Sequence, residues 1–251
     1  RQALAGTLQK TTQREIRECL QQASRVFSIC PGMAERLQKR YGIASRILYP
    51  VADHVTPASS MPASASQELV YVGSLGDCYL DVLQSVVDIL EAGVAPRRRL
   101  KIISRDRRTA TRVFAEKRSV AVHHDCNREQ LRQDIATAEA FLVPYSFNLR
   151  WKTTAITSFP SKFMDALAAG KPTVVLAPPY ASIARHMQAA NCGFVLDSVS
   201  QCGCLLAVRP WLKDTTWRQQ YDALLQRHHT RDAAPDGVLF LGWCSSALDS
   251  G

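Results

Sequence analysis

The sequence of 251 residues has no apolar run near the roughly 20 residues that a membrane-spanning helix needs. It also lacks a secretory signal, because it opens with RQALAGTLQKTTQREIREC and not with a charged cap followed by an apolar stretch. We therefore expect a cytoplasmic protein. Hydrophobic residues at 46% and charged residues at 21% are ordinary for a globular chain and argue against disorder. The length suits one large α/β domain or two small ones.

Cysteine spacings typical of zinc sites are missing as well, since the eight cysteines form no CxxC pair and no matching Cys/His set. In a reducing compartment free cysteines behave as small hydrophobic side chains. We therefore expect no disulfide, no metal and no cofactor. Cys202 and Cys204, in the segment CGC, form the one pair that merits a zinc assay.

Acidic residues are outnumbered, 22 against 31 basic ones, which leaves a net charge of +9. Residues 95–118 hold ten Lys and Arg against only Asp106 and Glu116, and they predict one strongly basic face. Such a face could serve nucleic acid, anionic lipid or a phosphorylated substrate. Aromatic residues that would stack on bases are almost absent there, so we expect no nucleic-acid partner. A solvated face and contact with the inner surface of an anionic membrane both stay open.

Short apolar runs alternate regularly with helical patterns, which is typical of repeated βαβ units around a parallel sheet. The predicted fold class is therefore α/β with a doubly wound, Rossmann-like parallel sheet. We expect strands at 69–72, 100–103, 119–122, 140–143, 173–177 and 193–196. Helical spacing of apolar residues between them supports this interpretation, at Leu80, Leu83, Val87 and Leu90 and at Leu131, Ile135 and Ala138.

A smaller unit precedes this sheet, with expected helices near 7–22 and 31–41 and strands at 25–29 and 46–50. It is too short to fold alone, so we interpret residues 1–50 as the remnant of a preceding Rossmann-like domain. The segment 51–66 is rich in proline and serine and predicts a linker. The second domain then covers residues 51–251.

Doubly wound sheets bind ligands beyond the carboxyl ends of their strands, where loops lead into helix N-termini. Two loops of this kind stand out. In YVGSLGDCYLD the chain leaves a strand through Gly73, Ser74 and Gly76, which would let the backbone approach an anion. Glycine in such a turn is equally explained by its dihedral angles alone.

The second loop is TSFPSKFMDALAAGKP, at residues 157–172, which predicts a short helix beginning near Ser158 or Phe159 and capped by Gly170. Ser158, Lys162 and Asp165 would then share one polar face, opposite Phe163. A solvated ion pair between Lys162 and Asp165 would explain these charges without any ligand.

The segment FPSKFMDALAAGKPTVVLAPP resembles a recurrent motif of the retaining GT-B glycosyltransferases of family four, often labelled group 1. YVGSLG is similar to the loop that opens their donor-binding domain, and SRVFSICPGMAERLQKRYGIASRILYPVAD is similar to the crossing between their two domains. The resemblance covers roughly residues 20–200. It implies that residues 1–50 end an acceptor-binding domain and that residues 51–251 bind a nucleotide sugar.

The resemblance also implies roles for particular residues. The carboxylate of Asp165 would accept hydrogen bonds from ribose hydroxyls, and the amides of Ser161 and Lys162 would meet the diphosphate. With Gly73 and Ser74 these residues form the expected donor site. The implied reaction moves a sugar from a UDP or GDP sugar to a glycan or lipid-linked acceptor, with retention, in polysaccharide or glycoconjugate biosynthesis.

Two features depart from this family pattern. Thr157 stands where many members have a Glu, and the glycine loop is followed by Asp77 and Asp81 instead of a basic pair. The charge of a diphosphate must then be balanced elsewhere, by Arg105, Lys162 or Lys152. No catalytic base is evident. Two other functions therefore stay open: a nucleotide-sugar epimerase or hydrolase, and a noncatalytic subunit that docks a glycan synthase on a membrane.

Overall fold

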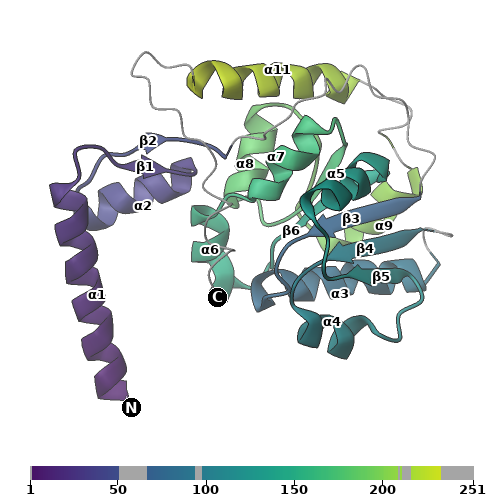
Figure 1. The fold of residues 1–251 in the computed structure, drawn as a ribbon, viewed down its shortest axis with the longest axis horizontal. Helices are drawn as coiled ribbons and strands as arrows, with labels where there is room; N and C mark the ends of the chain where they lie inside the picture. The colour runs from purple at the N-terminus through teal and green to yellow at the C-terminus, as the bar shows by residue number, and fades with distance from the viewer. Residues whose placement is uncertain (1, 51–66, 94–97, 209, 211–215, 233–251) are drawn as a thin grey trace.

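The computed structural model describes residues 2–50, 67–93, 98–208, 210 and 216–232. Figure 1 shows a parallel sheet enclosed by helices, and a smaller N-terminal unit that stands beside it. No helix within these ranges is long and apolar enough to cross a membrane.

The large sheet has six strands, all parallel to their neighbours. They are β3 (Glu68–Val72), β4 (Arg99–Ile103), β5 (Val120–His123), β6 (Ala140–Pro144), β7 (Thr173–Leu176) and β8 (Phe194–Leu196). The spatial order is β5-β4-β3-β6-β7-β8, which confirms the predicted doubly wound sheet. The chain therefore reverses its direction of winding between β3 and β6, and ligands of such sheets bind at this switch point.

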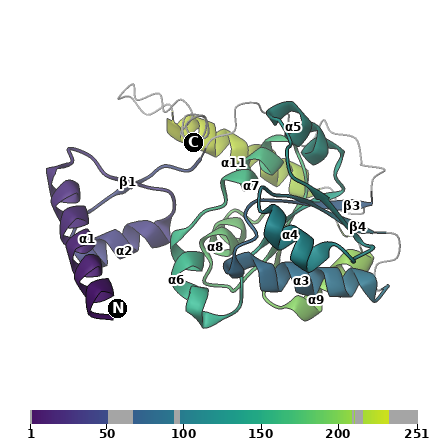
Figure 2. The same cartoon turned by 60° about the horizontal axis from the view of Figure 1, so that its bottom comes forward.

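Helices cover both faces of the sheet (Figures 1 and 2). One face carries α3 (Asp77–Glu91), α4 (Arg107–Phe114) and α9 (Val199–Val208), and α9 packs against α3. The other carries α5 (Arg128–Thr137), α7 (Ser161–Ala168) and α8 (Ser182–Ala189), with α11 (Thr216–Asp232) lying over α7. Because both faces are covered, every residue of β6 and β7 is buried, as expected for central parallel strands.

The N-terminal unit consists of α1 (Gln2–Gln22), β1 (Phe27–Ser28), α2 (Pro31–Tyr41) and β2 (Arg46–Ile47). Its strands are shorter than the predicted 25–29 and 46–50, because β1 and β2 pair only with each other within the described residues. Phe27, Ile29 and Ile47 remain 39%, 37% and 38% exposed. The unit therefore presents apolar side chains that a complete sheet would cover.

The same unit is nevertheless packed closely onto the larger one. A Cβ atom at Gly32 would lie 2.2 Å from the carbonyl oxygen of Ile156, so only glycine allows α2 to approach so closely. Nearby, the hydroxyl of Ser182 donates to Sγ of the buried Cys30 at 3.2 Å. Tyr49 adds a ring contact with Phe159, at 4.9 Å between centroids. The domain boundary predicted near residue 50 is thus bridged by packing contacts.

Helix α7 begins later than predicted, at Ser161 instead of Ser158 or Phe159. Ser158 ends the preceding helix α6 (Lys152–Thr157), and its amide donates to the carbonyl of Thr154 at 2.9 Å. The reason is Pro160, because a residue that precedes proline is disfavoured in the helical conformation. Ser158 therefore does not share the polar face of α7 with Lys162 and Asp165.

The end of α7 agrees with the prediction. Gly170 has a φ of 59°, its amide donates to the carbonyl of Leu167 at 3.0 Å, and the amide of Lys171 donates to Ala166 at 2.9 Å. This pair of bonds is the Schellman arrangement, which glycine favours because its left-handed backbone costs no Cβ clash. The helix therefore stops abruptly, and β7 follows within three residues.

Candidate functional site

The predicted site residues come from loops and helix starts at one edge of the sheet. Gly73 and Ser74 directly follow β3, and Arg105 lies two residues beyond β4. Ser161 and Lys162 open α7, which runs back from the edge where β6 ends. Because parallel strands end at a common edge, all of these residues lie on the carboxyl side of the switch point.

Hydrogen bonds with Asp106, which precedes α4, and with Tyr71 of β3 hold the glycine loop. The Asp106 carboxylate accepts from the Ser74 hydroxyl at 3.0 Å and from the Leu75 amide at 2.5 Å. The hydroxyl of Tyr71 donates to the carbonyl of Ser74. A Cβ atom at Gly73 would lie 2.8 Å from the Tyr71 hydroxyl oxygen, so a larger residue at this position would clash with the tyrosine. Asp106, counted by sequence reasoning only as one of two acids in a basic segment, is a structural anchor of the loop.

Tyr145, just beyond β6, links the first turn of α3 to the approach to α7. Its hydroxyl lies 2.9 Å from the hydroxyl oxygen of Ser158, and its ring packs edge-on against Tyr79 at 5.3 Å. Burial raises the pKa of Tyr145 to about 12, and burial also raises the pKa values of Tyr71 and Tyr79. These hydroxyls stay protonated at neutral pH. They serve as hydrogen-bonding groups, and Tyr145 belongs to the core.

Helix α7 displays its two charges one turn apart. Nζ of Lys162 lies 3.1 Å from a carboxylate oxygen of Asp165, and the side chains are 41% and 38% exposed. The ion pair that sequence reasoning offered as an alternative is therefore present. Exposed pairs of this kind contribute only about 0–1 kcal/mol to stability. Both groups are accessible to a ligand, and the fold does not depend on either.

The two acids that disfavour a diphosphate in the sequence, Asp77 and Asp81, both have hydrogen-bonding partners in the structure. Asp77, in the first turn of α3, lies 3.2 Å from the guanidinium of Arg150, which also stacks on Trp151. Asp81 accepts a hydrogen bond from the hydroxyl of Ser146. Arg150 comes from the 3-10 helix η2 (Leu149–Trp151), 73 residues further along the chain. Sequence reasoning missed this cation, because no local pattern connects it with the start of α3.

The other expected cations, Arg105 and Lys152, have different surroundings from Arg150. Arg105 is exposed, next to the anchoring Asp106. Lys152 begins α6, and its Nζ lies 5.2 Å from the centre of the Tyr180 ring. Thr157, at the position of the family's Glu, donates its hydroxyl to the carbonyl of Thr153 at 2.9 Å. That residue is thus engaged within its own helix.

The basic segment does not form the single face that its sequence predicts. Arg98 is buried against Glu139, with 3.4 Å between Nε and a carboxylate oxygen, and Lys101 points at Glu68. These cations balance acids from neighbouring strands and loops, which a linear charge count cannot show. Arg107 and Lys117 form ion pairs with Asp125 and Asp88. Arg108 and Arg112 are exposed and lie four residues apart on the outer side of α4, and the exposed Arg105 precedes this helix.

A polar pocket of about 440 Å³ opens beyond the end of β5. It is lined by Val122, His123, His124, Asp125, Cys126 and Gln130. Nδ1 of His124 lies 2.8 Å from the carbonyl oxygen of Ser104, which fixes this ring against the backbone. The pocket belongs to the same carboxyl edge as the glycine loop, two strands away from β3.

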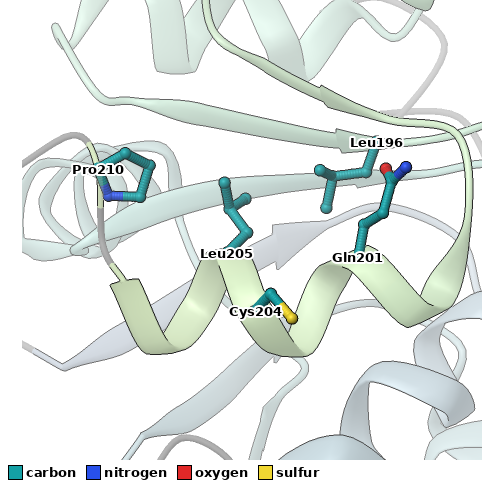
Figure 3. Close-up of a pocket in the computed structure, with 5 residues that line it drawn as sticks. All are labelled: Leu196, Gln201, Cys204, Leu205 and Pro210. Atoms are coloured by element: carbon teal, nitrogen blue, oxygen red, sulfur yellow. The ribbon is translucent and has the colours of Figure 1, made fainter.

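A second pocket, about 360 Å³ in volume, lies at the opposite side of the sheet and is nearly all apolar (Figure 3). Leu196 at the end of β8 faces Gln201, Cys204 and Leu205 of α9, with Pro210 beyond them. It contains none of the predicted site residues. Of the CGC pair, Cys202 is buried and Cys204 exposed, so the two thiols occupy different environments on α9.

Comparison with solved structures finds glycosyltransferases. WaaG, a glycosyltransferase involved in lipopolysaccharide biosynthesis, superposes with a TM-score of 0.59 at 17% identity, over 86% of this chain and 64% of that one. The lipopolysaccharide outer core galactosyltransferase WaaB superposes with a TM-score of 0.53 at 16% identity, over 84% of this chain and 59% of that one. The fold is that of the GT-B glycosyltransferases.

A mutant of S. aureus TarM, solved with fondaparinux, alpha-GlcNAc-glycerol and UDP, gives a TM-score of 0.57 at 9% identity, over 89% of this chain and 44% of that one. The chain thus spans less than two thirds of the length of these glycosyltransferases. No protein-family model matches it, and no curated protein is similar to it in sequence.

Proposed function

We propose that this chain binds the nucleotide-sugar donor of a glycosyltransferase in glycan biosynthesis. The observation that carries the proposal is the common placement of the glycine loop after β3 and the start of α7, both at the switch point of a sheet with strand order β5-β4-β3-β6-β7-β8. Helix N-termini at this position offer unpaired amides to an anion. The fold shared with WaaG and WaaB supports the same function.

The donor would lie across the switch point. The carboxylate of Asp165 would leave its ion pair with Lys162 and accept hydrogen bonds from the ribose hydroxyls. The amides of Ser161 and Lys162 would meet the diphosphate, and the backbone at Gly73 and Ser74 would close the other side. UDP, bound in the TarM structure, is the first nucleotide to test, with GDP as its competitor.

Arg150 and Arg105 would add the positive charge that the glycine loop itself lacks. Arg150 already lies beside the first turn of α3, where it balances Asp77 at 3.2 Å. A phosphate could share this guanidinium because its five donors form a wide fork. Lys162 would contribute a third charge, freed when Asp165 turns to the ribose.

The wider assignment follows from the same proposal. Residues 1–50 would complete an acceptor-binding domain, because their two-stranded sheet leaves Phe27 and Ile47 exposed. The reaction would transfer a hexose with retention to a glycan or lipid-linked acceptor, in the cytoplasm and without a metal cofactor. A catalytic base is not assigned, and the chain alone is expected to bind donor more readily than to transfer sugar.

Calorimetry with UDP and GDP tests the proposal. We expect saturable binding of one of them, and Asp165→Ala should weaken it by about 1–3 kcal/mol, the loss of a charged hydrogen bond. The matched control is Asp88→Ala, which also removes an exposed, ion-paired carboxylate, at 3.0 Å from Lys117. Unchanged affinity in Asp165→Ala, or an equal loss in both variants, would contradict the assignment.

The exposed arginines of α4 favour a second role, in which the protein also docks on anionic lipid. Arg108 and Arg112 lie on one side of the helix, Arg105 precedes it, and each basic residue near a charged membrane contributes about 1 kcal/mol. Flotation with vesicles containing anionic lipid should therefore decrease in high salt. Equal flotation with neutral vesicles, or no flotation, would remove this role.

A further inference from the structure

Three side chains of metal-binding type converge at the carboxyl end of β5. His123 is the last residue of that strand, Cys126 lies in the loop behind it, and Asp134 projects from α5. Their possible ligand atoms all lie within 4.8 Å of one another. Nitrogen, sulfur and carboxylate oxygen are the three ligand types that zinc takes in proteins.

The two oxygens of Asp134 are used differently. Oδ1 accepts hydrogen bonds from Nζ of Lys101 at 3.3 Å and from Nε2 of Gln130 at 3.2 Å. Oδ2 faces Sγ of Cys126 at 3.9 Å. Ligand carboxylates in metal sites are typically oriented in this way, with one oxygen held by outer hydrogen bonds and the other directed at the ion.

The charges around the group are also balanced. Nζ of Lys101 lies 3.1 Å from a carboxylate oxygen of Glu68, so its charge is shared between two acids. A thiolate at Cys126 and the carboxylate of Asp134 would together offset the two positive charges of a divalent ion. The polar pocket lined by His123, Cys126 and Gln130 gives the ion a route from solvent and leaves room for a water molecule as a fourth ligand.

We propose that His123, Cys126 and Asp134 bind one zinc-like divalent cation, with water completing a tetrahedral site. On binding, the sulfur of Cys126 forms the bond to the metal and its proton is released to solvent. The site does not depend on the proposed donor binding, since it uses none of the residues assigned to the nucleotide sugar. Sequence reasoning expected no metal here, because one ligand is a carboxylate from a separate helix that no local spacing reveals.

Cobalt titration tests the site on the reduced, chelator-treated full chain. One equivalent of Co²⁺ should give the absorption of a tetrahedral ion together with a thiolate-to-cobalt charge-transfer band, and Zn²⁺ should abolish both. Cys126→Ser should remove the charge-transfer band, and His123→Ala should weaken binding at least tenfold. Gln130, which hydrogen-bonds the ligand Asp134, can be changed to Ala, and the affinity for the metal should fall by about 10–100-fold.

The control is Cys204→Ser, which removes an exposed thiol on α9 and should change neither the band nor the stoichiometry. Circular dichroism of each variant checks that the fold is retained. A charge-transfer band that survives Cys126→Ser would place the metal on other thiols and overturn the proposal. So would the absence of any band in the folded wild-type protein at millimolar cobalt.

Discussion

The two sides of the switch point are built in different ways. Hydrogen bonds with Asp106 and Tyr71 fix the glycine loop, so the polar groups of the loop largely stabilise the fold. The start of α7 instead presents Lys162 and Asp165, whose side chains are 41% and 38% exposed and pair with each other. One side therefore supplies rigidity, and the other supplies charges that a ligand can bind.

The largest effect is expected at the anchor of the glycine loop. Asp106→Ala removes two hydrogen bonds to a charged acceptor and should lower the free energy of unfolding by about 2–3 kcal/mol. Urea denaturation measures the change. Asp106→Asn keeps one acceptor oxygen and should lose only part of that stability. A loss below about 0.5 kcal/mol in the Ala variant would show that the loop does not need its anchor.

A smaller effect is expected where the two sides are joined. Tyr145→Phe deletes the hydroxyl that lies 2.9 Å from Ser158 and keeps the buried ring. Unfolding should become easier by about 1 kcal/mol, the net contribution of one buried hydrogen bond. Thermal unfolding of the variant measures this, with Tyr41→Phe at an incompletely buried site as control. Equal stability of the variant and the wild type would mean that the link is dispensable.

A substitution of Arg150 tests whether this arginine supplies positive charge to a nucleotide bound at the switch point. Arg150→Gln should lower UDP affinity about three- to tenfold, which corresponds to about 0.6–1.4 kcal/mol. The difference should shrink as salt is raised, because the side chain is 60% exposed. Arg185→Gln is a matched control, since that exposed arginine pairs with Glu35 at 3.8 Å. A similar affinity loss in both variants would point to net charge in place of a specific contact.

The smallest effect concerns the pair on α7. Lys162→Ala should change the free energy of unfolding by no more than about 0.5 kcal/mol, because exposed ion pairs contribute little. The same variant should bind UDP more weakly, since it removes a charge beside the diphosphate. Denaturation and calorimetry on one preparation compare the two quantities. A variant that loses stability but keeps its affinity would reverse the contrast between the two sides of the switch point.

The sheet could be predicted from the sequence because its signal is local. Each strand is a short apolar run that both faces of a parallel sheet bury, and all six strands of the large sheet begin within one residue of the predicted position, as β3 and β6 illustrate. The start of α7 was missed by two or three residues. There Pro160 excluded Phe159 from the helix and left Ser158 to end α6.

The site could be predicted only in part. The structure places Gly73 after β3 and Ser161 at the start of α7, because glycine turns and helix starts leave local marks in a sequence. The role of Asp165 was implied by the family resemblance, and the binding roles of all three residues stay predictions. Arg150 and Asp106 were missed, since each acts on a residue more than 30 positions away. The basic segment was overestimated for the same reason, because the acids that hold Arg98 and Lys101 lie elsewhere in the chain.

The sequence by itself determined which residues form strands, where α7 ends at Gly170, and that loops rich in glycine and polar residues follow the strands. Only the tertiary structure decided which charges are already paired. Strand order places Asp134 beside Lys101 and Cys126, and Asp77 beside Arg150. The physical reason is that apolar periodicity acts between neighbours in the chain, whereas the balance of charge depends on which distant segments the folded sheet brings together.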